Sequence, residues 1–315
     1  MAETSEEPLP TSPLRVLALD GGGAKGFYTL GVLKEIEALV ECPLHQKFDL
    51  VYGTSTGAII ASLIALGYKV DDIYALYCKH VPTIMSQTKR EARSAALIKL
   101  VDEVFGKKTF ADVKTGIGVV AARWLTERPM IFKCHVGQAH GRAATFIPGF
   151  GVTIADAVKA SCSAYPFFDR TVVKTSKEGD VELIDGGYCA NNPTLYALAD
   201  AVEALGRLRQ DIRLVSVGVG TYPEPKPSFK MWFAKKYILT VELLQKTLEI
   251  NTQSMDQLRQ VLFPDVPTIR ISDAYTTPEM ATDLLEHNLT KLNVLFQCGG
   301  ESFASRETQL REFLM

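Results

Sequence analysis

Residues 18–26 read ALDGGGAKG, and this stretch decides the fold that we expect. It joins a short apolar run, Arg15–Leu19, to a helical pattern that begins at Phe27. Consecutive glycines leave backbone N–H groups bare beside the start of a helix, where a negative charge is stabilised. The stretch therefore predicts a strand, a glycine turn and a helix around an anion, either a nucleotide phosphate or the oxyanion of a reacting carbonyl.

A second unit of the same kind follows along the chain. Phe48–Tyr52 predicts a strand, Gly53–Gly57 a tight turn, and Ala58–Leu66 a buried helix. Parallel strands joined by a helix lie close together, and their outgoing turns meet at one edge of the sheet. We therefore expect the turns at Gly21 and Ser55 to be neighbours.

The rest of the chain continues this alternation. Further strands are predicted at Ile117–Ala121, Pro129–His135, Val181–Ile184 and Leu214–Val219, and further helices at Asp71–Lys79, Lys89–Glu103 and Ile154–Ser163. The alternation predicts an α/β, three-layer fold in which a mainly parallel central sheet is flanked by helices. We expect a disordered leader over residues 1–13, the sheet domain over residues 14–221, and a mostly helical C-terminal region over residues 222–315, packed on the same domain.

The composition is typical of a soluble globular protein, with 47% hydrophobic and 22% charged residues. A formal net charge of −2 argues against nucleic acid as a main partner. The acidic start carries no signal-peptide pattern, and no apolar run approaches the ~20 residues of a membrane span, so we predict a cytoplasmic location. The six cysteines form no CxxC pair, which argues against a metal site, and no cofactor is expected.

The second turn, Gly53-Thr54-Ser55-Thr56-Gly57, matches the GxSxG pattern of a nucleophilic serine. A serine at a sharp turn from strand to helix takes a strained backbone conformation. The flanking Gly53 and Gly57 lack side chains, so the strand and the helix can approach each other closely. We therefore take Ser55 as the candidate nucleophile.

The turn at Gly53–Gly57 also decides whether the glycine turn at Gly21 binds a nucleotide phosphate or an oxyanion. A dinucleotide-binding unit places an acidic residue at the end of its second strand to hold the ribose. Here Tyr52 and Gly53 stand at that position, and Asp49 lies near the beginning of the strand. This favours an oxyanion hole formed by the N–H groups of Gly21, Gly22 and Gly23. A non-catalytic nucleotide-binding module that uses the GGGAKG loop stays as an alternative.

Asp185 is the best candidate for the base that a nucleophilic serine needs. It ends a predicted strand and is followed by Gly186 and Gly187, which leave room around its carboxyl group. The alternative is an ordinary Asp-Gly turn. We favour a base because Asp185 should lie at the same edge of the sheet as Ser55.

These residues resemble those of the patatin-like phospholipases. The resemblance rests on three motifs in family order, namely Gly21–Gly26, Gly53–Gly57 and Asp185-Gly186-Gly187, together with the block ASCSAYPFFD at residues 160–169 and Asn191-Asn192-Pro193. It covers residues 14 to about 221, and beyond them it fades.

The resemblance implies a Ser-Asp dyad that needs no metal. Ser55 would attack the acyl carbonyl, Asp185 would take its proton, and the N–H groups of Gly21, Gly22 and Gly23 would hold the oxyanion. Lys25 would steady the loop or attract an anionic head group, although an exposed lysine is an equal alternative. Gly26 completes the first motif.

A different serine hydrolase stays as an alternative. Ser55, Asp185 and His287 follow the chain order of the triad in an α/β-hydrolase. In that fold, however, several strands normally precede the serine, and here only one strand and one helix precede the serine strand.

The resemblance also implies partners. The substrates would be membrane phospholipids, reached by peripheral contact, and Phe229–Leu244 interleaves aromatic residues with lysines in a way that suits a membrane surface. The bacterial branch of the family includes phospholipases that cyclic nucleotides switch on in anti-phage defence. A cyclic-nucleotide activator is therefore a further expectation, with the C-terminal helices and the basic helix at Lys89–Lys99 as the places to look.

Overall fold

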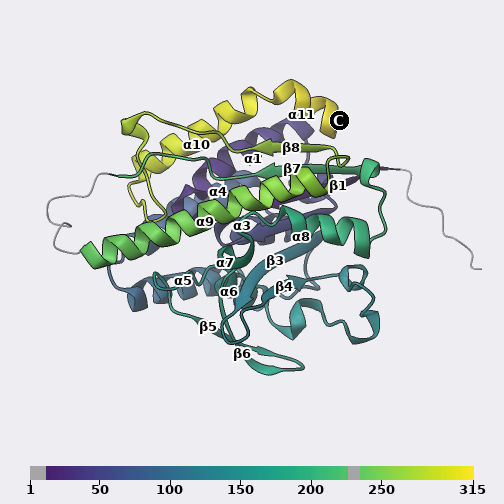
Figure 1. Cartoon of the computed structure of the whole chain (residues 1–315), viewed down its shortest axis with the longest axis horizontal. Coiled ribbons are helices and arrows are strands. Elements are labelled where there is room, and N and C mark those ends of the chain that lie inside the picture. The colour runs from purple at the N-terminus through teal and green to yellow at the C-terminus, as the bar shows by residue number, and fades with distance from the viewer. Residues whose placement is uncertain (1–11, 226–234) are drawn as a thin grey trace, which may run out of the picture.

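The computed structural model describes residues 12–225 and 235–315, and the side chains of residues 235–241 are not part of this description. It is a three-layer arrangement in which helices cover both faces of a central sheet (Figure 1). The strands are β1 (Leu14–Leu19), β2 (Leu50–Thr54), β3 (Gly116–Arg123), β4 (Pro129–Lys133), β5 (Thr171–Thr175), β6 (Gly179–Asp185), β7 (Ile212–Val217) and β8 (Thr268–Ile271). The α-helices are α1 (Gly26–Val40), α2 (Leu44–Lys47), α3 (Thr56–Ala65), α4 (Val70–Met85), α5 (Arg90–Val104), α6 (Ile154–Ser161), α7 (Gly187–Ala190), α8 (Thr194–Ala199), α9 (Lys235–Leu262), α10 (Leu289–Ala304) and α11 (Glu307–Leu314).

The sheet has the strand order β5-β6-β3-β2-β1-β7-β8, and β4 pairs with β3 along the edge opposite to β2 and β6. The five strands from β3 to β8 in this order are parallel, which confirms the predicted α/β fold with a mainly parallel sheet. Leu19 at the end of β1 pairs with Gly53 in β2. The glycine turn and the serine turn therefore leave the sheet side by side, as expected.

The other part of the sheet differs from the expectation. Both β4 and β6 run antiparallel to β3. The expectation that Asp185 reaches the site as the end of a parallel strand is therefore wrong. Two strands were also missed, since neither β5 nor β8 was predicted. The latter lies in the region expected to be mostly helical, and it extends the sheet beside β7.

Both faces of the central strands are buried. In β1, Leu17 and Leu19 belong to one hydrophobic core, whereas Val16 and Ala18 belong to a second core on the opposite face. Because side chains alternate across a strand, this division requires a layer of helices on each side of the sheet. All residues of α3 are buried, as expected for a helix enclosed between layers.

Two C-terminal helices frame the region around the glycine turn. Helix α10 packs along α1, where Gly31 and Gly299 let the two backbones meet: a Cβ on Gly299 would lie 2.1 Å from the carbonyl oxygen of Tyr28. Helix α9 crosses the front of the molecule over the sheet (Figure 1) and contacts α7 and α8. Since α1 begins directly after the glycine turn and α10 also contacts Gly23–Lys25, α10 supports that turn.

Some predictions fall on residues that the structure does not describe. Residues 1–11 of the predicted leader lie outside the described residues, as do residues 226–234 and the side chains up to Val241, which form most of the proposed membrane segment. Within the described ranges, no helix is long and apolar enough to cross a bilayer. The domain boundaries and the cytoplasmic location stay predictions.

Candidate active site

Ser55 lies at the sharp turn between β2 and α3, with a backbone conformation of φ 53° and ψ −122° that non-glycine residues rarely adopt. The neighbouring glycines explain how the turn closes. A Cβ on Gly53 would lie 2.2 Å from the carbonyl oxygen of Gly57, and a Cβ on Gly57 would lie 2.3 Å from that of Leu19. Ser55 thus projects from a strained turn, which can close because the residues two positions before and two positions after it are glycines.

The hydroxyl group of Ser55 donates a hydrogen bond to the carboxyl group of Asp185. The distance between Ser55 Oγ and Asp185 Oδ2 is 2.7 Å. The second carboxyl oxygen, Oδ1, accepts a bond of 2.7 Å from the N–H group of Gly187, which fixes the orientation of the carboxyl group. The two side chains chosen from the sequence are therefore in direct contact.

The register of three strands explains this contact. Thr54 in β2 pairs with Val120 in β3, and the next residue of β3, Ala121, pairs with Asp185 in β6. Ser55 follows Thr54, so it lies level with Ala121 and hence with Asp185. The antiparallel β6 ends at that level, and its last residue meets the first residue beyond β2.

Burial changes the acidity of Asp185, whose side chain is 2% exposed. Loss of hydration raises the pKa of Asp185 to about 7, and the hydrogen bonds from Ser55 and Gly187 limit the rise. A carboxyl group with a pKa near neutrality is a far better proton acceptor for a hydroxyl than an ordinary aspartate.

The glycine turn lies against Ser55, since a Cβ on Gly21 would be 3.3 Å from Ser55 Cβ. The N–H group of Gly21 donates to the carbonyl oxygen of Asn191 at 2.9 Å, so it is already engaged. Among the described residues, no backbone acceptor binds the N–H groups of Gly22 and Gly23. Gly23 has φ +57°, and a Cβ there would lie 2.5 Å from the carbonyl oxygen of Leu284. Of the three predicted donors, Gly22 and Gly23 are therefore the two without an acceptor in the described part of the chain.

Asn191 holds the glycine turn in place. Its side-chain nitrogen donates to the carbonyl oxygen of Gly21 at 3.2 Å and to the hydroxyl group of Thr252 in α9 at 2.7 Å. Its backbone N–H donates to Asn251 Oδ1, also in α9, at 2.8 Å. The sequence marked Asn191 through its motif but carried no sign of the two residues in α9.

Ser161 is a supporting residue that sequence reasoning did not single out within its block. Its hydroxyl group accepts a bond of 2.9 Å from the N–H group of Ser55 and donates one of 2.6 Å to the carbonyl oxygen of Val120. The strained turn is thereby tied to β3, the strand that pairs with both β2 and β6.

Lys25 is buried, which removes the alternative of an exposed lysine. It is 3% exposed, and its Nζ atom lies 3.4 Å from Glu249 Oε1 in α9. Burial lowers the pKa of Lys25, and Glu249 partly restores it. The lysine therefore connects the glycine turn to α9 and does not point to solvent as an isolated charge.

The remaining motif glycines allow close contacts between the turns. A Cβ on Gly26 would lie 2.5 Å from Thr56 Oγ1, and one on Gly186 would lie 2.2 Å from the carbonyl oxygen of Val120. A Cβ on Gly187 would lie 2.8 Å from a methyl group of Leu248 in α9.

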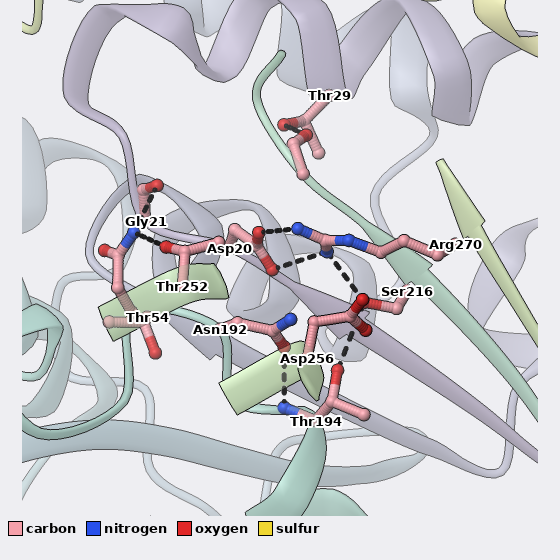
Figure 2. A network of polar contacts seen from close by, with 12 residues as sticks. Asp20, Gly21, Thr29, Thr54, Asn192, Thr194, Ser216, Thr252, Asp256 and Arg270 are labelled. Atoms are coloured by element: carbon pink, nitrogen blue, oxygen red, sulfur yellow. Dashed lines mark hydrogen bonds and ion pairs between the residues drawn. The ribbon is translucent and has the colours of Figure 1, made fainter. Parts of the chain in front are cut away.

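A network of polar contacts lies behind the glycine turn (Figure 2). The guanidinium group of Arg270 in β8 reaches over β7 to the carboxyl group of Asp20, with an Nη1–Oδ1 distance of 3.0 Å. The same Nη1 donates to Ser216 Oγ at 2.8 Å, and Ser216 contacts Thr194 at 3.1 Å. This network holds the end of β1, from which the glycine turn starts.

An apolar pocket opens beside Ser55 and Asp185. Its walls come from α3, α4, α5, the segment after α6, α9 and the segment before α10. The apolar side chains that line it include Ile59, Tyr77, Val81, Ile84, Leu97, Leu100, Phe167, Phe168, Leu248 and Leu284. Gly22 and Gly23 also line it. The pocket suits a hydrocarbon chain whose end is held at the serine.

The structure does not support a triad with His287. This residue is exposed, and its Nδ1 atom lies 3.3 Å from the carbonyl oxygen of Leu285, whereas the carboxyl oxygens of Asp185 contact Ser55 and Gly187. In the part of the chain that the structure describes, no group of three or more His, Cys, Asp or Glu side chains is arranged to hold a metal ion.

Comparison with known proteins identifies the family. The family model described as patatin-like phospholipase matches residues 17–198. The chain belongs to the patatin-like phospholipase family. A protein of Escherichia coli named cUMP-AMP-activated phospholipase is 70% identical over 301 residues, which cover 96% of this chain and 94% of the relative. The prediction of a hydrolase of this family is therefore confirmed, and the nucleotide-binding module without activity is excluded.

Other relatives agree with this result. A cGAMP-activated phospholipase of Pseudomonas aeruginosa is 29% identical over 224 residues, which cover 65% of this patatin-like phospholipase and 62% of the relative. The crystal structure of VipD from Legionella pneumophila has a TM-score of 0.52 at 16% identity and covers 96% of this chain and 67% of that one. This second likeness concerns the fold.

Proposed function

We propose that this patatin-like phospholipase hydrolyses the fatty-acyl esters of membrane phospholipids through a dyad of Ser55 and Asp185. The observation that carries the proposal is the 2.7 Å hydrogen bond from Ser55 Oγ to Asp185 Oδ2 beside an apolar pocket. A phospholipid would place one acyl chain in this pocket, with its ester carbonyl at Ser55.

The reaction has two halves. Ser55 Oγ attacks the carbonyl carbon while its proton passes to Asp185 Oδ2, and the N–H groups of Gly22 and Gly23 hold the oxyanion. The intermediate collapses, and the alcohol of the lysophospholipid leaves with the proton from Asp185. Water then attacks the acyl-enzyme while Asp185 accepts its proton, and Asp185 passes this proton to Ser55 Oγ as the fatty acid is released.

Labelling and lipid analysis test the dyad. A fluorophosphonate probe is expected to label Ser55, and liposomes incubated with the enzyme should release fatty acids and lysophospholipids, detected by mass spectrometry. Ser55→Ala should abolish both, and Asp185→Asn should reduce hydrolysis by about 10²- to 10⁴-fold, the usual contribution of a general base. Ser86→Ala, at an exposed serine, is the control. Full activity of Asp185→Asn would contradict the dyad.

Peripheral membrane contact is part of the same proposal. Helix α9 lines the acyl pocket with Leu248, and its outward side carries Leu243 and Ile250, which are 65% and 68% exposed. A helix with an exposed apolar side next to a lipid pocket suits the surface of a bilayer. We expect Leu243→Ser with Ile250→Ser to lower co-sedimentation with phospholipid vesicles, whereas Leu208→Ser, at a residue 50% exposed elsewhere, should not. Unchanged sedimentation of the double variant would contradict this surface.

The names of the relatives support a regulated enzyme. Both the E. coli and the P. aeruginosa relatives are named as phospholipases activated by cyclic dinucleotides. By this similarity, the proposed activator of the present chain is a cyclic dinucleotide. The proposed role of the enzyme is that of a membrane-degrading effector in anti-phage defence. Cyclic UMP-AMP should increase the release of fatty acids from liposomes by the purified enzyme.

A further inference from the structure

A second cavity lies away from the dyad and is lined by residues of β4, the segment that follows β4, and the β5–β6 hairpin. Figure 1 shows where these strands lie in the molecule. Its volume is about 540 Å³, within the range of ordinary small-molecule sites. None of the described residues lines both this cavity and the acyl pocket. The proposed hydrolysis therefore leaves this cavity without a role.

The exposed face of β4 forms one wall of the cavity. The half-buried Ile131 and Lys133 line it, and the alternate residues Met130 and Phe132 are buried, although Met130 also borders the cavity. At ~3.3 Å per residue, the wall from Pro129 to Lys133 is about 13 Å long. This length is enough for two linked nucleotides and exceeds what a single phosphate group needs.

The cavity is strongly cationic. Arg123, Lys133, Arg142 and Lys177 line it, and Glu178 is its only acidic lining residue among those described. Arg123 is paired with Glu178 at 2.7 Å, and Lys133 is paired with the buried Asp200.

Two of these cations have no carboxylate partner within the described part of the chain. The side chain of Arg142 is exposed, and the Nζ atom of Lys177 contacts only the carbonyl oxygen of Thr145, at 2.6 Å. The pair would match a ligand with two negative charges.

Aromatic side chains line the same cavity. Phe146 and Phe150 are both partly exposed there. Phe150 is held at φ 56°, a left-handed conformation that costs a bulky residue free energy, and the adjacent Gly149 and Gly151 also have positive φ. The backbone at this point is fixed by a 2.9 Å bond from the N–H group of Ser176 to the carbonyl oxygen of Phe150. The ring of Phe150 packs edge-on against Phe132 of β4, with 5.8 Å between the ring centroids. The partly exposed ring of Phe146, beside these cations, is suited to stack a base.

We propose that this cavity binds the activating cyclic dinucleotide, with its two phosphodiester groups at Arg142 and Lys177 and a base against Phe146. The inference rests on the proposed activation by such a ligand and adds its site. It also replaces the expectation that the basic helix at Lys89–Lys99 is the place to look. Arg93 of that helix is buried and donates to the carbonyl oxygen of Phe167 at 3.1 Å, so it has a structural role.

A chain of contacts connects the cavity to the nucleophile. The fully buried carboxyl group of Asp200 binds Lys133 and His140, which line the cavity, and it also accepts a hydrogen bond from the hydroxyl group of Tyr52 in β2. Tyr52 precedes Ser55 by three residues in the same strand and turn. Because Lys133 and His140 line the same cavity, we expect the bound dinucleotide to draw them away from Asp200, so that its binding reaches the strand that carries the serine.

Calorimetric titration of the full chain with cyclic UMP-AMP tests the site. Arg142→Ala with Lys177→Ala should weaken binding by at least about tenfold, since each removes a charge-assisted contact. Lys89→Ala with Lys99→Ala removes the same charge from exposed positions of the predicted basic helix and should bind like the wild type. Thermal unfolding checks that both variants are folded. Equal binding by the first variant, or weaker binding by the second alone, overturns the proposal.

Two further measurements distinguish a wrong ligand assignment from a wrong hydrolase function. Glycerophosphoglycerol, a lipid head group, and inorganic phosphate should not displace cyclic UMP-AMP at concentrations near its Kd; displacement would make the cavity a general phosphate or head-group site and overturn the dinucleotide assignment. If neither cyclic UMP-AMP nor cyclic GMP-AMP binds the wild type, the inference is overturned, and fluorophosphonate labelling of Ser55 still decides on its own whether the hydrolase function stands.

Tyr52→Phe tests the connection. This change keeps every cation of the cavity and removes only the hydroxyl group that joins Asp200 to β2. Its affinity for cyclic UMP-AMP should stay within about twofold of the wild type, while the nucleotide should accelerate the labelling of Ser55 by the fluorophosphonate less than it does in the wild type. Equal acceleration in the two proteins would overturn the route through Asp200.

Discussion

Asp185 accepts a proton only as a carboxylate, so its pKa of about 7 decides how the enzyme responds to pH. We expect kcat/KM for a soluble ester to rise with pH through about 7 and to level off above it. Well below that pH, the value should fall about tenfold per pH unit, because the fraction of ionised Asp185 falls in this way. A profile that stays flat down to about pH 5 would indicate an ordinary aspartate and contradict the effect of burial.

At the scale of single residues, the sequence was informative wherever a motif carries its own mechanical reason. Ser55 between two glycines and Asp185 before two glycines were found in this way, and the structure brings them together. The engaged N–H group of Gly21 and the burial of Lys25 were not predictable, since their partners are Asn191 and Glu249, far away in the sequence. Such pairings depend on the folded chain and leave no local pattern.

Two adjacent glycines of α10 allow a matched test of how this helix packs on α1. A Cβ on Gly299 would lie 2.1 Å from the carbonyl oxygen of Tyr28, whereas a Cβ on Gly300 would meet nothing closer than 4.0 Å. Gly299→Ala should lower the free energy of unfolding by about 1–3 kcal/mol or more, because the backbones must separate. Gly300→Ala should raise it by about 0.5–1 kcal/mol through helix propensity. Urea unfolding measures both, and equal effects would contradict the close crossing.

At the scale of elements, the parallel units around β1 and β2 were predicted and the edges of the sheet were not. The strand β8 has only four residues, and its TIRI pattern includes an arginine, half-buried in the structure, that a sequence pattern does not suggest for a strand between layers. The direction of β6 was also missed, because a short apolar run looks the same in either orientation. The site was nevertheless found, since Asp185 ends β6 at the level of Ser55 in both arrangements.

Arg270 connects strands that are far apart in the sequence, so it bears on the stability of the whole molecule. Removal of the guanidinium group would leave the carboxyl group of Asp20, 1% exposed, without its partner. Arg270→Met should therefore lower the free energy of unfolding by about 3–5 kcal/mol. Adding Asp20→Asn should restore part of this loss, because no unpaired charge remains buried.

The exposed pair of Arg311 and Glu307 provides the control for this measurement. Arg311→Met removes the same chemical group at the surface and should change the free energy of unfolding by about 1 kcal/mol or less. If Arg270→Met behaved like this control in urea unfolding, the pair with Asp20 would not be what holds β8 to the end of β1.

The pairing of β6 with β3 has a consequence for how inactive variants are interpreted. Only three residue pairs, from Ala121–Asp185 to Arg123–Leu183, join the strand of the acid to the strand beside the serine. A slip of one position would move Asp185 by about 3.3 Å and turn its carboxyl group to the opposite face. Both reacting groups would then be present, but the enzyme would be inactive. We therefore expect an inactivating substitution in the hairpin that ends at Asp185 to act by shifting the register of β6 on β3, while Ser55 and Asp185 themselves stay chemically intact.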